Sequence, residues 1–118
     1  MKTFDTGATR DEDYDKLNYA DGLSEQVDER YLLYLQKHRT LPDGSLRAWN
    51  NWKKGIPKDR YRQSLMRHVR HLNKKLMGLP VPEDASLEDL CCAVRFNVDG
   101  LLFELLVAQS GNRELDNV

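Results

Sequence analysis

Residues 86–109 read SLEDLCCAVRFNVDGLLFELLVAQ, and this long apolar stretch decides the fold. It opens with Ser86-Leu87-Glu88-Asp89, which resembles a helix capping box with Asp in place of Glu at the third helical position. Gly111 follows shortly after the last apolar residues and is typical of a helix end. The pattern predicts a helix over residues 86–109.

Two further helices are expected before it. Ser24 can cap a helix over residues 24–40, which has acidic residues in its first turns. Pro57 suits the first turn of another helix, over residues 57–77. The apolar residues of that helix share one helical stripe, formed by Tyr61, Leu65, Val69, Leu72 and Leu76.

The segments around these helices have little apolar periodicity. Residues 1–23 read as an extended arm, residues 41–45 (LPDGS) as a turn, and residues 110–118 as a frayed tail. The sequence shows no repeats and no convincing strands. We therefore expect residues 1–118 to form a single all-α domain, a small bundle of three main helices with its core in residues 24–109.

Length and composition narrow the class of protein. A chain of 118 residues, 40% hydrophobic and 31% charged, is typical of one globular domain with a thin core, which self-association would thicken. No apolar run approaches the ~20 residues that span a membrane. The N-terminus lacks a signal-peptide core, and Cys91 and Cys92 are adjacent and cannot form a disulfide framework. These features favour a cytoplasmic protein, without membrane contact, secretion or structural zinc.

Charge is divided along the chain. Residues 31–75 carry twelve basic and two acidic side chains, whereas both flanks are acidic. Acids beside bases can hold a divalent metal next to a phosphate chain, or they can simply neutralise each other as surface pairs. A pI near 6.3 argues against a nucleic-acid partner.

The helix over residues 86–109 carries a face of small and polar residues: Asp89, Ala93, Asn97, Gly100 and Glu104. In a functional interpretation, Asp89 and Glu104 offer oxygens to a metal and Asn97 hydrogen-bonds a base or ribose. In a structural interpretation, Asn97 is a buried bridge between helices and both acids lie at a wet edge. The residues alone leave both interpretations open.

The first helix and the following segments hold the other candidates. Glu25 and Glu29 can face a divalent cation or compensate the helix dipole. His68, beside Arg67, can contact phosphate or a base, or pack in the core. In the loop over residues 49–55, tryptophan can stack on a base, amides can read its edge and lysines can reach phosphate, although a tryptophan can equally plug a small core.

Six segments, in this order, carry a family resemblance. The chain resembles phage proteins described as dATP/dGTP diphosphohydrolase-like, relatives of the all-α MazG-type nucleotide pyrophosphohydrolases, over about residues 3–107. The matching segments are FDTGATRD (4–11), ERY (29–31), KHR (37–39), NWKKGIP (51–57), RH (67–68) and CAVRFN (92–97).

The resemblance implies a MazG-like helical bundle, usually oligomeric, that binds a purine deoxynucleoside triphosphate with Mg²⁺. The implied reaction is attack by water between the α and β phosphates, which yields a monophosphate and pyrophosphate. By position, Glu29 and Asp89 would be catalytic and would hold metal, with Glu25 or Glu88 as further ligands. Phosphates and base would contact Arg10, Arg39, Asn51, Trp52, Lys54, Arg67, His68 and Asn97.

The acidic pattern departs from that family. MazG-type enzymes carry pairs of acids three residues apart, but Leu32 stands three residues after Glu29 and Cys92 stands three residues after Asp89. Fewer acids hold fewer metal ions, so a nucleotide-binding module that sequesters its ligand without cleaving it is the alternative, for example against a host defence that uses a nucleotide signal. A small interaction protein, whose apolar stripes serve only assembly, is a third reading.

Overall fold

The computed structural model describes residues 2–3, 5–10, 16–82 and 84–111. The chain divides into two compact units, residues 1–30 and 31–118, and each is described here by itself. None of the described helices has the length and apolar character that a membrane span requires.

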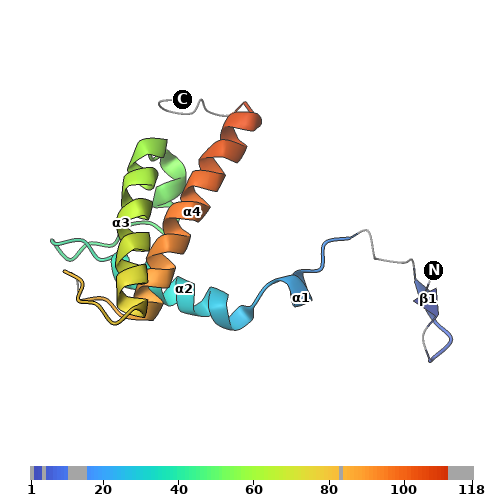
Figure 1. Ribbon diagram of the computed structural model, residues 1–118. Coiled ribbons are helices and arrows are strands. Elements are labelled where there is room, and N and C mark those ends of the chain that lie inside the picture. The colour runs from blue at the N-terminus through green and yellow to red at the C-terminus, as the bar shows by residue number, and fades with distance from the viewer. Residues whose placement is uncertain (1, 4, 11–15, 83, 112–118) are drawn as a thin grey trace. The chain divides into compact units, whose positions relative to one another are not determined.

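The first unit begins with two very short strands (Figure 1). β1 (Lys2–Thr3) pairs antiparallel with β2 (Thr9–Arg10), and Gly7 lies between them with a φ of +83°. The expectation of an arm without strands is therefore wrong at two residues on each side of a turn. The short helix α1 (Tyr19–Gly22) follows, and the side chain of Asn18 caps it by accepting a hydrogen bond from the backbone N–H of Asp21.

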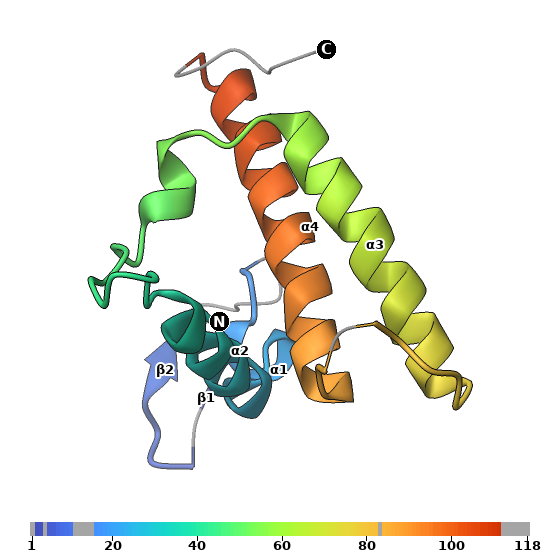
Figure 2. The same cartoon turned by 90° about the vertical axis from the view of Figure 1, so that its left-hand side faces the viewer.

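The second unit is built on an antiparallel pair of helices. α3 (Lys58–Leu76) and α4 (Leu87–Gln109) lie side by side in both Figure 1 and Figure 2, and they make the main packing contact between elements. The expected cap is present, because the Ser86 hydroxyl accepts from the backbone N–H of Asp89 at 3.0 Å. The all-α fold is confirmed, and the predicted helix ends agree within two residues.

The boundary between the two units falls within the remaining predicted helix, α2 (Glu25–His38). Its second half belongs to the second unit from Tyr31 onward, and Tyr31 is buried beneath the guanidinium of Arg95, which lies 4.3 Å from the ring centroid. A short 3₁₀ helix, η1 (Asn51–Lys54), connects the region after α2 to α3 and contacts α4.

The core between α3 and α4 centres on Tyr61. The residue is 2% exposed, and its ring lies directly against the backbone of Gly100 and 6.1 Å from the ring of Phe96. A Cβ atom at Gly100 would overlap the Tyr61 ring. The small residue on the predicted polar face of α4 is therefore there because a large aromatic ring packs on it.

The predicted apolar stripe of α3 is confirmed in part. Tyr61 is buried and Leu65 and Leu72 are half-buried, but Val69 and Leu76 are 42% and 66% exposed. Ser64 and His68, at i+3 and i+7 from Tyr61, are half-buried as well. The inner face of α3 thus includes polar residues, because it borders a cavity as well as the core.

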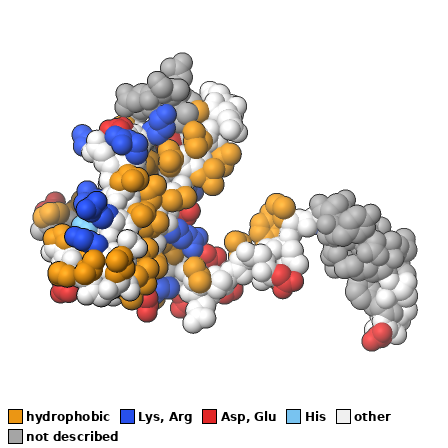
Figure 3. Space-filling view, in the orientation of Figure 1, with side chains coloured by type: hydrophobic (Ala, Val, Ile, Leu, Met, Phe, Trp, Pro, Cys, Tyr) orange, Lys and Arg blue, Asp and Glu red, His pale blue; other side chains and the backbone are white. Residues whose placement is uncertain are grey.

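Apolar side chains also gather on the surface of the second unit (Figure 3). α4 exposes Val98, Leu102 and Leu106 by 45%, 52% and 52%, at a spacing of four residues that places them in one row. We call these three residues the α4 apolar row.

Candidate functional site

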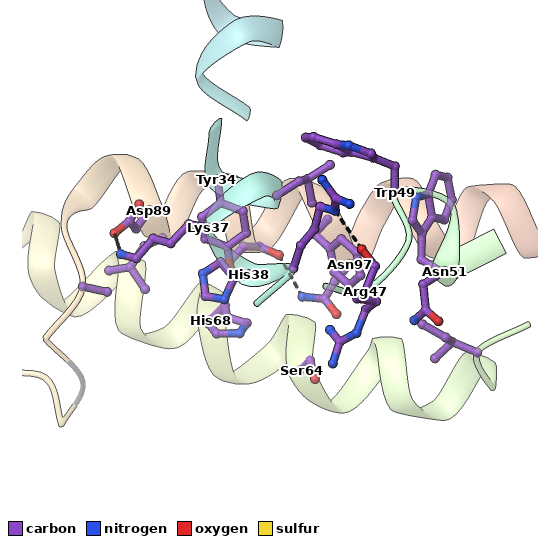
Figure 4. A pocket seen from close by; sticks show the side chains of 18 of the residues that line it. Tyr34, Lys37, His38, Arg47, Trp49, Asn51, Ser64, His68, Asp89 and Asn97 are labelled. Carbon is purple, nitrogen blue, oxygen red and sulfur yellow. Dashed lines mark hydrogen bonds and ion pairs between the residues drawn. The ribbon is translucent and has the colours of Figure 1, made fainter. Parts of the chain in front are cut away.

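A cavity of about 560 Å³ lies within the second unit (Figure 4). Its walls come from the end of α2, the following loop, η1, α3 and the first half of α4. Ligand pockets for small molecules and cofactors usually measure ~300–1,000 Å³. The cavity therefore has the size of a site for a nucleotide-like molecule.

A tight turn joins the two segments of the loop that line the cavity. The N–H of Leu41 donates to the carbonyl of Ser45 at 2.9 Å, and Gly44 adopts a φ of +87° that favours glycine. The Asp43 carboxylate accepts from the backbone N–H and the hydroxyl of Ser45, and these hydrogen bonds lower the Asp43 pKa. The turn predicted at residues 41–45 is confirmed.

The turn closes a small hairpin that pairs two arginines. Thr40 and Leu46 form an antiparallel bridge, and the N–H of Arg47 donates to the carbonyl of Arg39 at 2.7 Å. Arg39 and Arg47, eight residues apart in the sequence, thus lie opposite each other, and both line the cavity.

Arg39 is held in place as a wall of the pocket. Its Nε donates to the backbone carbonyl of Arg47 at 2.7 Å, and its guanidinium lies 4.7 Å from the ring centroid of Trp49. A guanidinium over an indole face is a favourable cation–π contact. Arg39 and Trp49 therefore stabilise one side of the cavity together.

His38 and Asp89 lie at the opposite end of the pocket. The His38 ring lies against the ring of Tyr34, tilted by 45° with centroids 4.3 Å apart. Burial lowers the His38 pKa, assisted by the charges of Lys37 and Arg47 and opposed by Asp89. The Asp89 carboxylate, 20% exposed, lies 3.6 Å from the ammonium of Lys37. Burial and two nearby cations thus favour the neutral form of His38, whereas Asp89 favours its charged form.

Asn97 is both buried and part of the pocket. It is 4% exposed, and its amide nitrogen donates to the carbonyl of Ala93, one turn earlier on the same helix, at 2.8 Å. The interpretation as a bridge between helices is corrected, because the bond stays within α4. The amide orientation is fixed by this bond.

The two acids of the predicted α4 face do not act together. Asp89 lines the pocket, whereas Glu104 is 8% exposed and lies about 22 Å further along the helix axis. At this separation the two acids cannot share a metal ion. Glu104 is also buried and does not lie at a solvent-exposed edge, so both expectations for that residue are wrong.

The structure brings about half of the predicted site residues together. The pocket is lined by Arg39, Asn51, Trp52, His68, Asp89 and Asn97, whereas Lys54, Arg67 and Glu88 are exposed and do not line it. Glu25, Glu29 and Arg10 belong to the first unit, and the side chain of Arg10 lies outside the described residues.

Trp52 has a structural role as well as a place in the wall. Its ring meets Phe103 of α4 edge-on at 5.0 Å, and the Lys53 ammonium lies 5.4 Å from the same ring. This contact attaches η1 to α4, as a tryptophan that plugs a small core would do.

Several lining residues are not among the site residues predicted from the sequence: Lys37, His38, Arg47, Ser64 and Asp84. Arg47 had one usable signal, because a turn at residues 41–45 sets the residues on either side of it against each other. Ser64 and Asp84 had none, since only the packing of α3 beside α4 places them at the cavity.

The magnesium ion implied by the family resemblance finds no group of ligands among the described parts of the chain. In those parts, no three His, Cys, Asp or Glu side chains converge so that they could hold a metal ion. The acidic side chains in the described lining are Asp84 and Asp89. We therefore derive no step through a metal.

Comparisons of the chain with protein-family models, with curated proteins and with solved structures find no match.

Proposed function

We propose that this protein binds a phosphorylated nucleoside, a purine deoxynucleoside triphosphate in the first instance, in the pocket of its second unit. One observation supports this most: a lysine, two arginines, two histidines and two tryptophans line the pocket, against two carboxylates in its described lining. Cations attract phosphate, and indole rings offer flat apolar surface to a base. The choice of a purine deoxynucleotide rests on the family resemblance.

The reaction proposed from that resemblance is diphosphohydrolysis. Water attacks between the α and β phosphates, pyrophosphate leaves, and a deoxynucleoside monophosphate remains. Asp89 supports this candidate, because its carboxylate lies in the pocket beside Lys37. A carboxylate within reach of the attacking water can accept its proton.

Binding without cleavage is the second candidate. It is favoured by the small number of carboxylates among the lining residues and by the ion pair that occupies Asp89. Such a protein would sequester its nucleotide and need only the cations and the aromatic rings.

One experiment separates the two candidates. Each of the four deoxynucleoside triphosphates is titrated into the protein by calorimetry, and pyrophosphate release is assayed in parallel with and without Mg²⁺. Binding with pyrophosphate release that Asp89→Asn abolishes identifies the hydrolase; binding without release identifies sequestration. If no nucleotide binds, the proposed function is wrong.

We also propose that a second copy of the chain covers the α4 apolar row. Three exposed aliphatic side chains in one row on a long apolar helix form the kind of surface that homodimers bury.

A further inference from the structure

The two arginines of the hairpin over residues 39–47 have different surroundings. The guanidinium of Arg39 is engaged by the backbone of Arg47 and by the ring of Trp49. The side chain of Arg47 instead runs across the cavity toward Ser64 on α3 (Figure 4). Arg47 therefore brings a guanidinium to the α3 side of the pocket, which we call the pocket floor.

The charge of Arg47 is not neutralised within the part of the chain that the structure describes. The two acidic residues of the described lining are Asp84 and Asp89, and no ion pair joins either of them to Arg47; Asp89 pairs with Lys37 instead. The charge of Arg47 acts on His38, whose pKa is lowered mainly by burial and by Lys37 and to a smaller extent by Arg47.

Two side chains of α3 that can donate hydrogen bonds line the same cavity as Arg47. Ser64 and His68 are four residues apart, so both lie on the same side of the helix, and both line the cavity. Figure 4 shows Ser64 close to the end of the Arg47 side chain, with His68 one turn further along. A planar guanidinium, a hydroxyl and an imidazole can each donate to a phosphate oxygen.

We propose that Arg47, Ser64 and His68 form a phosphate seat, which holds a phosphate group of the nucleotide directly and without a bridging divalent metal. This inference rests on the proposed function and specifies which residues bind the phosphates. It differs from the assignment by sequence, in which Arg67 and Lys54 face the phosphates. Both of those residues are exposed and lie outside the lining.

Direct recognition has two measurable consequences. Because protein cations neutralise the phosphate, removal of Mg²⁺ should leave the affinity unchanged. Because Arg47 supplies charged hydrogen bonds that a neutral side chain cannot, its loss should weaken binding of the phosphorylated ligand and leave the unphosphorylated nucleoside unaffected.

The test is a calorimetric titration of dATP, deoxyadenosine and inorganic pyrophosphate, each with Mg²⁺ and with a chelator. The proteins are the wild type, Arg47→Gln, Arg47→Lys and Ser64→Ala. Arg67→Gln is the matched control, since it removes an exposed arginine from α3, one turn from Ser64. Circular dichroism establishes that each variant is folded.

We expect Arg47→Gln to weaken dATP binding about tenfold or more, Arg47→Lys to weaken it less, and Arg67→Gln to leave it unchanged. Wild-type affinity should be the same in the chelator. The seat is refuted if dATP binds but Arg47→Gln does not weaken it, or if the chelator abolishes binding. If no nucleotide binds, the proposed function is wrong, and the seat is then tested with pyrophosphate alone. It is supported if Arg47→Gln binds pyrophosphate more weakly than wild type, and refuted if the two bind alike.

Discussion

Single side chains in this pocket owe their properties to their neighbours. His38 has a lowered pKa because it is partly buried and lies near Lys37 and Arg47. Asn97 has a fixed amide because the carbonyl of Ala93 accepts its N–H. The pocket therefore presents cationic groups and oriented dipoles before any ligand arrives, which reduces the cost of ordering them on binding.

The His38 pKa makes a prediction about stability and pH. In the folded protein this pKa lies below that of the unfolded chain, so the unfolded state binds the proton more tightly once the pH falls below about 6.5. Acidification therefore costs stability through His38. We expect the melting temperature to fall between about pH 8 and pH 5.5 in wild type, and to fall less in His38→Gln.

The control for this measurement is His71→Gln, which removes a histidine from α3 instead of the pocket end of α2. An equal pH dependence in wild type and His38→Gln would show that His38 titrates alike in the folded and unfolded states.

At the scale of elements, the contact between α3 and α4 positions the site. Ser64 and His68 come from α3 and Asn97 from α4, so a change in the distance between these helices would move the floor of the pocket. The two helices are in tight contact at Gly100, where the ring of Tyr61 occupies the space of a side chain. One large and one small residue therefore fit together at this point.

Gly100→Ala should destabilise the protein by about 1–3 kcal/mol, despite the better helix propensity of alanine, because the added methyl group overlaps the Tyr61 ring. Chemical denaturation monitored by circular dichroism measures the change. Gly22→Ala is the control, since a Cβ atom there meets nothing within 4 Å.

A double-mutant cycle tests the cause. In a Tyr61→Leu background the ring is gone, so Gly100→Ala should cost less than in wild type. An equal cost in both backgrounds would mean that Tyr61 is not the obstacle.

At the scale of the whole molecule, the second unit buries little apolar surface for its size. Among the described residues, the buried apolar side chains are Tyr31, Tyr61, Leu90, Cys92 and Ala93. α4 meanwhile exposes the apolar row of Val98, Leu102 and Leu106. A second copy packed on this row would thicken the thin core that the chain length predicts.

We expect the purified protein to exceed 13.7 kDa in a solution mass measurement, and Leu102→Glu to shift it to the monomer mass, because a carboxylate in an apolar interface is costly to desolvate. Leu79→Glu provides the comparison, since Leu79 is similarly exposed but lies after α3 and outside the α4 apolar row. A wild type of monomer mass would contradict the proposed dimer.

The sequence by itself determined the three helices, their ends and the turn at residues 41–45. These features depend on short-range physics: Ser86 caps the first turn of α4, Asp43 hydrogen-bonds Ser45, and Gly44 takes a positive φ. Groups a few residues apart decide them, so the order of residues is enough.

Only the tertiary structure decided which side chains share the pocket. Arg47 from the hairpin, Ser64 from α3 and Asn97 from α4 line one cavity, and the Arg47 side chain points toward Ser64 (Figure 4). Helical periodicity gave α3 an apolar stripe through Val69, whereas packing against α4 turned Ser64 and His68 inward. Long-range contacts depend on which faces fit one another, and the Tyr61 ring on Gly100 is a fit that no local pattern encodes.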